Sequence, residues 1–378
     1  MGGGLTLDGL NRQPQIGNTR LQAPIGLAPF NSGMFGQDGS IGTDGLSFYR
    51  SFCNDRLGLL CVGGLAVAAA GRANRSSMCL DRDERAHGLR LVCETAHAAG
   101  VKVAVQIEHA GRQTGPHETG LPSVAATAAP CPVVGGSPSA LSLGEISLIV
   151  DQFVHTAEIA ARAGADLIEV HAAHGYLLSG FLSAATNTRQ DRYGGNLERR
   201  FRIVHEIVTR AHAAVGHRIG IRINVHEDLP GGMTPDQAIA GLRNLRTKLA
   251  YISISGGMYT RARDVIIPRR TLSRALWRDQ AATVRTELGV PVMIAGNIDT
   301  PELAASLLEH NVSDVVLFGR SLLADPDMLI SATTGRQIQP CTDCGQCKYH
   351  TKGYPHIYCP FHPTLRPLRS TWKRRRTD

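Results

Sequence analysis

Short apolar runs alternate with longer amphipathic stretches along most of the chain. The apolar runs are continuous rather than alternating in polarity, which is typical of parallel strands that are covered on both faces. We therefore expect strands at residues 24–28, 57–62, 101–107, 166–170, 219–223, 251–255, 292–295 and 314–318.

The segments between these runs have the apolar spacing of helices, most clearly at residues 84–100, 144–164 and 235–249. Eight strand–helix units without a linker-like break predict an α/β protein with a (β/α)8 TIM barrel rather than a doubly wound sheet, which gives a similar alternation. In such a barrel, functional side chains lie at the carboxyl ends of the strands and in the loops that follow. We place the barrel at residues 1–335, a cysteine-rich segment at 336–365 and a basic tail at 366–378.

Composition narrows the class of protein. The 378 residues are 43% hydrophobic, which is enough for a large core. No apolar run reaches the length of a membrane span and the N-terminus lacks a signal sequence, so we expect a cytoplasmic protein that binds no membrane. The formal net charge is +8, but residues 366–378 contribute five of these charges through six basic residues and one acidic residue. Because the remaining chain is nearly neutral, we expect no nucleic-acid partner.

Polar residues and glycines fall at several of the expected strand ends. Glycines and an arginine after the seventh and eighth strands are typical of a phosphate site, because backbone N–H groups and a guanidinium both bind phosphate oxygens. Each residue alone is a weak signal, since glycine ends many strands and a lone arginine often forms a surface ion pair. The joint placement of Gly296, Asn297, Gly319 and Arg320 favours a phosphate site. The polar residues at the other strand ends are Gln106, His171, His174 and Arg222.

The stretch from residue 169 to 203 holds the most specific pattern. His171 and His174 are three residues apart on the expected first turn after a strand, where two imidazole N–H groups can reach one oxygen. Such a pair would polarise a carbonyl and stabilise the enolate that forms as hydride reaches the β-carbon, while the phenol of Tyr176 exchanges the α-proton. Without further matches, ordinary packing or half of a zinc site would be the preferred explanation of the two histidines.

The further matches span most of the chain. Besides residues 169–203, the stretches that match are, in chain order, "APFNSGM" (28–34), "VGGLAV" (62–67), "VQIEHAGR" (105–112), "IAGNI" (294–298) and "LFGRSLLADPD" (317–327). Together these stretches resemble the Old Yellow Enzyme, or NADH:flavin oxidoreductase, family of FMN-dependent (β/α)8 enzymes. The resemblance covers the chain to about residue 330.

The resemblance implies roles for individual residues. Gln106 and Arg222 would face the isoalloxazine ring, and the residues after the last two strands would bind the phosphate. His171 and His174 would bind the substrate oxygen, with Tyr176 as the proton donor. We interpret Arg189, Asp191, Tyr193, Gly194 and Gly195 as braces of the loop. The implied FMN contacts are Ala28, Pro29, Phe30, Asn31, Gly64, Gln106, Arg222, Gly296, Asn297, Gly319 and Arg320.

Four of the nine cysteines are grouped near the end of the chain. Cys341, Cys344, Cys347 and Cys359 have the spacing C-x2-C-x2-C-x11-C, which suits a cubane cluster held by one loop. Zinc stays open on composition alone, because His350, His356 and His362 offer further zinc ligands. One branch of the family, with trimethylamine dehydrogenase and 2,4-dienoyl-CoA reductase, carries a [4Fe–4S] cluster directly after the barrel. The resemblance therefore favours a [4Fe–4S] cluster on these four cysteines.

The expected function combines both cofactors. We expect an FMN- and [4Fe–4S]-dependent oxidoreductase that transfers hydride at a C=C bond conjugated to a carbonyl, or runs the reverse desaturation. No G-x-G-x-x-G follows an expected strand, so electrons would pass through the cluster to or from a ferredoxin or electron-transferring flavoprotein, or NAD(P)H would reduce the flavin directly. The other partners would be a small-molecule substrate and further copies of the chain in a homo-oligomer.

Two positions depart from the family pattern. Asn31 stands where trimethylamine dehydrogenase has the cysteine that links its flavin, so we expect noncovalent FMN. Glu108 stands where relatives often have tryptophan or a small apolar residue, so a carboxylate would line the substrate pocket and favour a cationic substrate. Alternatively, Glu108 turns outward and pairs with Arg112 or His109.

Two other functions stay open. The cysteine spacing and Glu108 would also suit an amine dehydrogenase that oxidises a C–N bond. A protein of another class, a non-catalytic barrel with a zinc-stapled tail, would leave the polar groups of Gln106, Arg222 and Arg320 unpaired. The small-residue insert at 114–142 follows the third strand, where a loop would lie over the flavin mouth.

Overall fold

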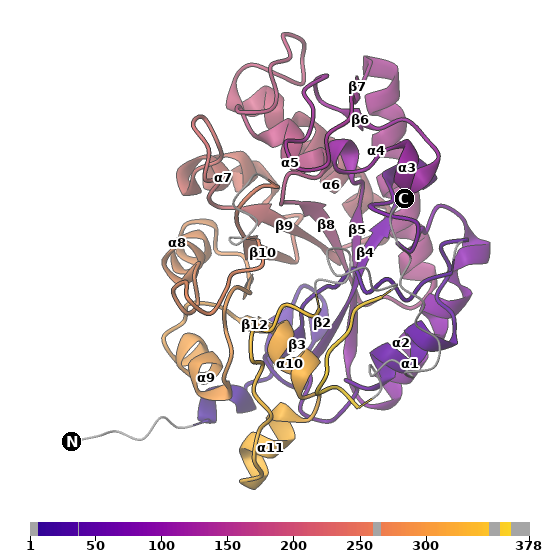
Figure 1. The fold of residues 1–378 in the computed structure, drawn as a ribbon. Helices are drawn as coiled ribbons and strands as arrows, with labels where there is room; N and C mark the ends of the chain where they lie inside the picture. The colour runs from indigo at the N-terminus through magenta and orange to yellow at the C-terminus, as the bar shows by residue number, and fades with distance from the viewer. Residues whose placement is uncertain (1–6, 37, 260–265, 348–355, 364–378) are drawn as a thin grey trace.

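Eight parallel strands close into a barrel in this computed structural model, which describes residues 7–36, 38–259, 266–347 and 356–363 (Figure 1). The neighbours around the barrel are β10-β11-β12-β3-β4-β5-β8-β9. All eight expected strands and the (β/α)8 fold are confirmed. The strands are β3 (Ile25–Leu27), β4 (Leu59–Ala66), β5 (Lys102–Glu108), β8 (Leu167–Ala172), β9 (Ile219–Asn224), β10 (Tyr251–Ser255), β11 (Val292–Ile294) and β12 (Val315–Phe318).

Side chains fill the interior of the barrel. Leu59, Leu167 and Met293 point inward from three different strands and are fully buried in one apolar cluster. Gly220 makes room for the ring of Tyr251 on the neighbouring strand, since a Cβ there would come within 2.2 Å of that ring. The barrel therefore has a packed core, and space for ligands is confined to its ends.

Helices surround the barrel as Figure 1 shows. The helix expected at 84–100 forms as a 3-10 turn, η3 (Asp83–Ala86), followed by α2. The helix expected at 235–249 is shorter than predicted, since α7 is followed directly by the 3-10 turn η5 (Arg243–Leu245). The helices are α1 (Thr43–Arg50), α2 (His87–Ala98), α3 (Pro116–Thr119), α4 (Leu143–Arg162), α5 (Leu177–Leu182), α6 (Leu197–Val215), α7 (Pro235–Leu242), α8 (Arg278–Leu288), α9 (Pro301–Glu309), α10 (Arg320–Ala324) and α11 (Met328–Thr334). Three more 3-10 turns are η1 (Asp8–Asn11), η2 (Ala69–Gly71) and η4 (Gly111–Gln113).

Local sequence explains where several helices begin. The Ser142 hydroxyl accepts a hydrogen bond from the Glu145 amide, and the Glu145 carboxylate accepts one from the Ser142 amide, which forms a capping box for α4. Thr234 and Thr300 cap α7 and α9 in the same position, each with proline as the next residue. None of the helices in the described ranges combines the length and the hydrophobicity that a membrane crossing requires.

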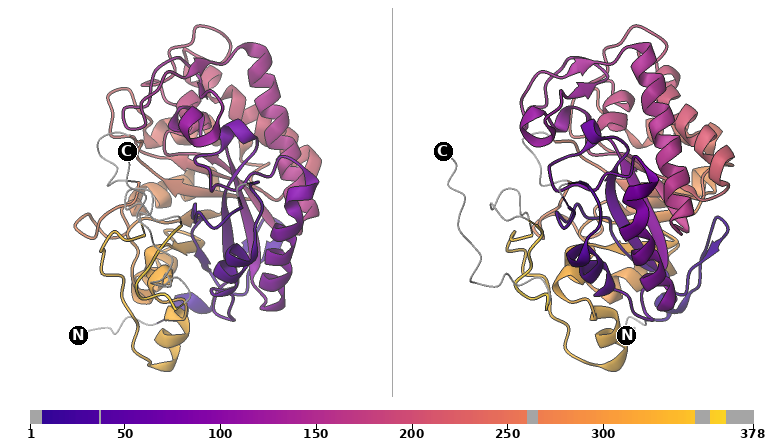
Figure 2. Two further views of the ribbon diagram at one scale, coloured as in Figure 1. Left: turned by 45° about the vertical axis from the view of Figure 1, so that its right-hand side comes forward. Right: turned by 90° about the vertical axis from the view of Figure 1, so that its right-hand side faces the viewer.

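The two ends of the barrel are covered by different segments, as the right-hand view of Figure 2 shows. A hairpin of β1 (Gln15–Ile16) and β2 (Thr19–Arg20) covers the amino end, and the cysteine segment lies at the opposite end. The insert at 114–142 contains α3 and a second two-stranded sheet, β6 (Val124–Ala125) with β7 (Ser139–Ala140). The basic tail at 366–378 lies outside the described residues.

Candidate active site

Two histidines and a tyrosine meet at the carboxyl end of β8. His171 lies within β8 itself, so the expectation that both histidines lie on the first turn after the strand is wrong for His171. His174 adopts a left-handed backbone, with φ 63°, and this turn brings its ring to 5.1 Å from the His171 ring. The Tyr176 ring also lies 5.1 Å from the His171 ring. The three side chains therefore form one cluster of adjacent rings.

His174 is held by residues from neighbouring strands. Its Nε2 lies 2.6 Å from the Ser255 hydroxyl at the end of β10, and its backbone N–H donates to the Asn224 side chain at the end of β9. The Gln113 amide donates to its backbone carbonyl at 2.6 Å. Asn224 is fixed in turn, because its amide donates to Glu227 at 3.0 Å. These contacts fix the imidazole before any ligand binds.

Both histidines are neutral near pH 7. Desolvation, followed by repulsion from Arg222, lowers the pKa of His174 to about 3. Desolvation, followed by the charges of His174 and Arg222, holds the pKa of His171 well below its usual value. Nδ1 of His171 is buried, with no hydrogen-bond partner in the described chain. A neutral imidazole donates one hydrogen bond without a net charge, which suits binding of a carbonyl oxygen.

A buried carboxylate joins the two side chains expected beneath the flavin ring. Glu169, on β8, accepts hydrogen bonds from Nε2 of Gln106 at 2.7 Å and from Nε of Arg222 at 3.0 Å. One Arg222 amine nitrogen, Nη2, is buried without a partner among the described residues. No motif in the sequence marks Glu169, although its place two residues before His171 on β8 puts it on the same inward face. The free Arg222 donor fits an acceptor atom of a flavin ring.

Glu108 turns into the site. Its side chain is buried, and Oε1 has no hydrogen-bond partner in the described parts of the chain. The alternative in which it pairs outward with Arg112 or His109 is wrong: the Arg112 guanidinium donates instead to the carbonyls of Ala129 and Pro130. Burial raises the pKa of Glu108 to about 7.

Two glycines leave room for these inward side chains. A Cβ on Gly63 would lie 2.7 Å from the Gln106 side chain, and one on Gly64 would lie 2.1 Å from the Glu108 carboxylate. The same Gly63 position would lie 3.0 Å from Pro29, in the loop after β3. The two glycines therefore let the backbone of β4 pack closely against Gln106 and Glu108.

The loop after β3 is tied to both neighbours. The Ala28 amide donates to the Phe318 carbonyl at 2.8 Å, and the Asn31 side chain donates to the Ser77 hydroxyl at 3.0 Å. The Phe30 ring lies near Gly319, where a Cβ would be 3.8 Å from it.

The residues of the expected phosphate site lie at the carboxyl end of the barrel, after β11 and β12. They are Gly296, Asn297, Gly319 and Arg320. Gly296 has φ +122° and packs against the Trp277 ring, and the Asn297 amide donates to the Leu272 carbonyl at 2.8 Å. The Arg320 guanidinium forms an ion pair with Asp343. Arg320 therefore lies between this end of the barrel and the cysteine segment.

The four grouped cysteines line one cavity. In the described part of the chain, no three His, Cys, Asp or Glu side chains lie close enough to hold one metal ion. His356 hydrogen-bonds to the Ile357 carbonyl and His362 to the Ser51 hydroxyl, and His350 lies outside the described residues. Four thiols therefore surround the cavity together with the Asp343 carboxylate, which pairs with Arg320, and four thiols fit an iron–sulfur cluster. The lining includes Cys341, Cys344, Cys347, Cys359, Arg320 and Tyr358.

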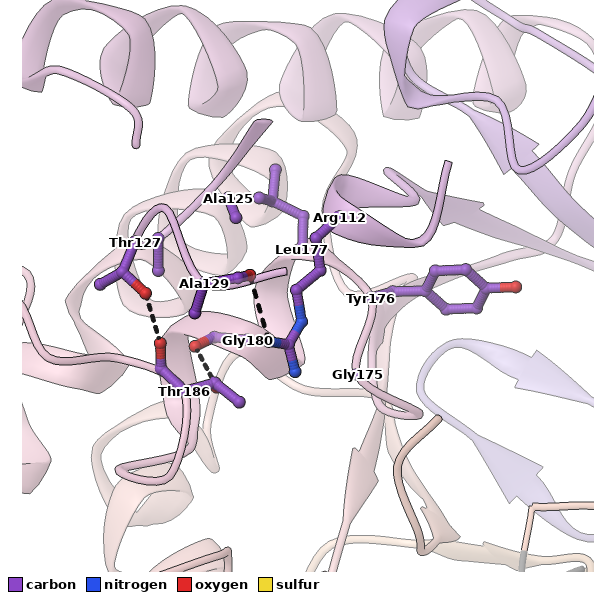
Figure 3. A pocket seen from close by; sticks show the side chains of 10 residues that line it. Arg112, Ala125, Thr127, Ala129, Gly175, Tyr176, Leu177, Gly180 and Thr186 are labelled. Atoms are coloured by element: carbon purple, nitrogen blue, oxygen red, sulfur yellow. Dashed lines mark hydrogen bonds between the residues drawn. The ribbon is translucent and has the colours of Figure 1, made fainter. Parts of the chain in front are cut away.

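A further small cavity lies behind Tyr176, between the insert and α5 (Figure 3). Ala125, Thr127 and Ala129 of the insert form one wall, and Gly180 and Thr186 form another. Both threonine hydroxyls donate to backbone carbonyls, and the Tyr176 ring points away from the cavity. The insert therefore packs against the turn that carries Tyr176.

The motif after Tyr176 acts as a brace. Arg189 donates to Asp191 at 3.1 Å and to the carbonyls of Ala126 and Leu141 in the insert. Tyr193 is buried and donates to Glu206 at 2.9 Å. Gly194 packs against Arg189, where a Cβ would lie 2.3 Å from the Arg189 carbonyl oxygen. Gly195 has φ +85° and its carbonyl accepts from Arg200.

Comparison with known proteins gives a consistent result. A model of the "NADH:flavin oxidoreductase / NADH oxidase family" matches residues 13–339. An NADH oxidase from Thermoanaerobacter brockii is 33% identical over 87% of this chain and 52% of its own length. A metal reductase from Desulforamulus reducens is 31% identical over 91% of this chain and 52% of its own length. The chain thus spans about half the length of these curated relatives.

Solved structures share the fold. A complex of 2-naphthoyl-CoA reductase with 2-naphthoyl-CoA superposes with a TM-score of 0.89 and covers 95% of this chain and 58% of that one. The identity is 22%, so this match describes the fold alone.

Proposed function

The chain belongs to the NADH:flavin oxidoreductase / NADH oxidase family, and on this premise we propose that it binds FMN and transfers hydride at a C=C bond conjugated to a carbonyl. The observation that carries the proposal is the pair of neutral imidazoles, His171 and His174, that meets Tyr176 beside the unpaired donor of Arg222. This membership confirms the family resemblance that the sequence predicted.

The proposed FMN site uses the residues named from the sequence. FMN, when bound, supplies the ring system that exchanges hydride with the substrate. Gln106 and Arg222 would hold the ring through donors that Glu169 orients, and Gly64 would face it. The loop of Ala28, Pro29, Phe30 and Asn31 would flank it, with Asn31 leaving the flavin noncovalent. Gly296, Asn297, Gly319 and Arg320 would bind the phosphate through backbone N–H groups and a guanidinium.

The proposed chemistry is divided among three side chains. His171 and His174 donate hydrogen bonds to the substrate carbonyl oxygen, which gains negative charge as hydride adds to the β-carbon. Tyr176 then donates its phenolic proton to the α-carbon, which completes the saturated carbonyl product. The reverse sequence desaturates a ketone. Because Ser255 and Asn224 fix His174, little reorganisation is needed when the charge develops.

We also propose that Cys341, Cys344, Cys347 and Cys359 hold a [4Fe–4S] cluster. Their shared cavity supports a cluster over zinc, because no three potential ligands in the described residues converge on one metal ion as zinc requires. Electrons would pass through the cluster to or from a ferredoxin or electron-transferring flavoprotein. NADH is the alternative reductant, as the name of the Thermoanaerobacter relative suggests.

Glu108 favours a second candidate function. A buried carboxylate without a partner would attract a cationic substrate, as in an amine dehydrogenase that oxidises a C–N bond. The neutral histidine pair argues for the carbonyl substrate, because each imidazole can donate an N–H to an oxygen but has no negative charge to attract a cationic amine.

Elemental analysis of anaerobically purified protein is the first test. We expect about four irons and one phosphorus per chain, and oxidation of the reduced flavin by cyclohexenone in a single turnover. One zinc without iron would contradict the cluster. Flavin reduction by an amine, with none by saturated ketones, would replace the carbonyl chemistry with the amine dehydrogenase. A colourless chain without phosphorus would leave the non-catalytic barrel.

A further inference from the structure

Asp343 connects the cysteine cavity with the barrel. It lies between the first two grouped cysteines, and its carboxylate pairs with the Arg320 guanidinium and accepts a hydrogen bond from the Arg270 backbone at 3.0 Å. Its backbone is left-handed, with φ 55°, a conformation that aspartate and asparagine tolerate better than most side chains. The carboxylate therefore fixes the turn of the cysteine segment against the barrel.

The contacts continue into two barrel loops. Arg270 donates to the Cys341 carbonyl and pairs with Asp299, which lies two residues after Asn297. Arg274 also pairs with Asp299, through a hydrogen bond of 2.9 Å. One network of opposite charges therefore joins the cysteine segment to the loops after β10 and β11 and to the start of α10. Figure 1 shows the cysteine segment beside α10.

We propose that Asp343 is a positioning residue that couples the cysteine site to the FMN phosphate site through Arg320. A filled cysteine site fixes the turn from Cys341 to Cys347, which holds the Asp343 carboxylate in place. Asp343 then holds the guanidinium of Arg320 at the end of the barrel where the phosphate binds. This inference rests on the proposed FMN and cluster sites, and it adds an energetic link between them.

The direction of the link follows from preorganisation. An arginine that is already oriented loses less conformational entropy when a phosphate binds, so FMN binds more tightly to the cluster-loaded chain. By linkage, FMN must then retain the cluster more tightly by the same factor. Without the carboxylate, Arg320 keeps its hydrogen bond to the Pro268 carbonyl but loses its contact with the cysteine segment, so its position no longer depends on whether the cysteines are occupied and the link is lost.

A double-mutant cycle tests the link. We would measure the dissociation constant of FMN, by quenching of flavin fluorescence, for the wild-type chain and the variants Asp343→Asn, Cys344→Ala and the double variant. Asn keeps the shape and tolerates the left-handed backbone, and Cys344 is the exposed member of the four cysteines, so its loss disturbs the core least. Wild-type protein from which a chelator has removed the iron repeats the comparison without a substitution.

Iron loss should raise the FMN dissociation constant roughly five-fold or more in the wild-type background and leave it unchanged in the Asp343→Asn background. The control Asp83→Asn removes a carboxylate from the exposed ion pair with Arg162 and should behave as wild type. An equal rise of the FMN dissociation constant in both backgrounds, or no rise in the wild type, would overturn the link. Either result would leave the proposed FMN and cluster sites unaffected. A chain that binds no iron or no FMN would overturn the link and the proposed site together.

Discussion

Arg222 and Glu169 form an ion pair between neighbouring strands, with 3.0 Å between Nε and Oε1, and their side chains are only 6% and 2% exposed. The pair is buried at the centre of the candidate flavin site, and Gln106 donates to the same oxygen. A buried ion pair of this kind is weak support for stability, but breaking it leaves an uncompensated charge. Glu169 thus determines where the Arg222 donors point.

Replacing Glu169 by Gln should therefore destabilise the protein and weaken FMN binding. The Arg222 charge would remain buried without an anion, and we expect a loss of about 3 kcal/mol in the free energy of unfolding. Chemical denaturation measures this loss. Asp151→Asn, which removes an exposed ion pair with Arg210, is the control and should change stability by less than about 1 kcal/mol. A Glu169→Gln protein as stable as this control would contradict the role given to Glu169.

Replacing Tyr176 by Phe separates the two half-reactions. Reduction of the flavin by NADH should keep its rate, while reduction of an enone should slow about 100-fold because the α-carbon receives no phenolic proton. Stopped-flow absorbance of the flavin follows both steps. Tyr259 is the matched control, since its ring lies 6.0 Å from that of Tyr176. If Tyr259→Phe slows the enone step and Tyr176→Phe does not, the proton donor is Tyr259.

Glu108 should make stability depend on pH. Its pKa is raised from 4.5 to about 7 in the folded chain, so the folded state binds more protons than the unfolded state between these values. Its contribution to stability is therefore largest at acid pH and falls as the pH rises through 7. Glu108→Gln should gain stability relative to wild type between pH 5 and pH 8, by up to about 3 kcal/mol.

Urea denaturation of both proteins at several pH values measures this difference. At low pH, protonation of buried histidines such as His171 lowers the stability of both proteins, so this effect cancels in the comparison. A difference that stays constant from pH 5 to pH 8 would show that Glu108 keeps an ordinary pKa.

Gly64 should tolerate no side chain while Glu108 is present. A Cβ would lie 2.1 Å from the Glu108 carboxylate, so we expect Gly64→Ala to lower the free energy of unfolding by about 1–3 kcal/mol. The combination with Glu108→Ala should recover most of this loss. Thermal unfolding measures it, with Gly42→Ala as the control because nothing lies within 4 Å of a Cβ there. An equal loss in the free energy of unfolding with and without Glu108 would mean that the contact between residue 64 and Glu108 does not cause the destabilisation.

The sequence was most informative where a single strand or a short stretch of residues determines the structure. The continuous apolar runs predicted all eight barrel strands, because each buried strand shows its burial in its own residues. The histidine pair and Tyr176 were found for the same reason, since they lie within six residues. The left-handed backbone of His174 was not predicted, because no residue pattern in this stretch indicates it.

Partners from distant strands escaped prediction. Ser255 lies 81 residues from His174, and Arg222 lies 53 residues from Glu169, so no local pattern relates them. Glu108 was recognised as unusual, but its direction needed the structure. The alternation of side chains along a strand offered a hint, because Glu108 lies two residues from the inward-facing Gln106.

The contacts of the loop after β3 also set an order of folding. β3 pairs with β12 to close the barrel, and the Ser32 carbonyl in that loop accepts a hydrogen bond from the Ile357 amide at 2.7 Å. During synthesis, the first barrel strand must therefore wait for the last one, and its loop must wait still longer for the segment beyond the cysteines. The loop beside the candidate flavin site thus leaves the ribosome early but reaches its final contacts only after residue 357 has been made, so the nascent barrel stays open until β12 is available.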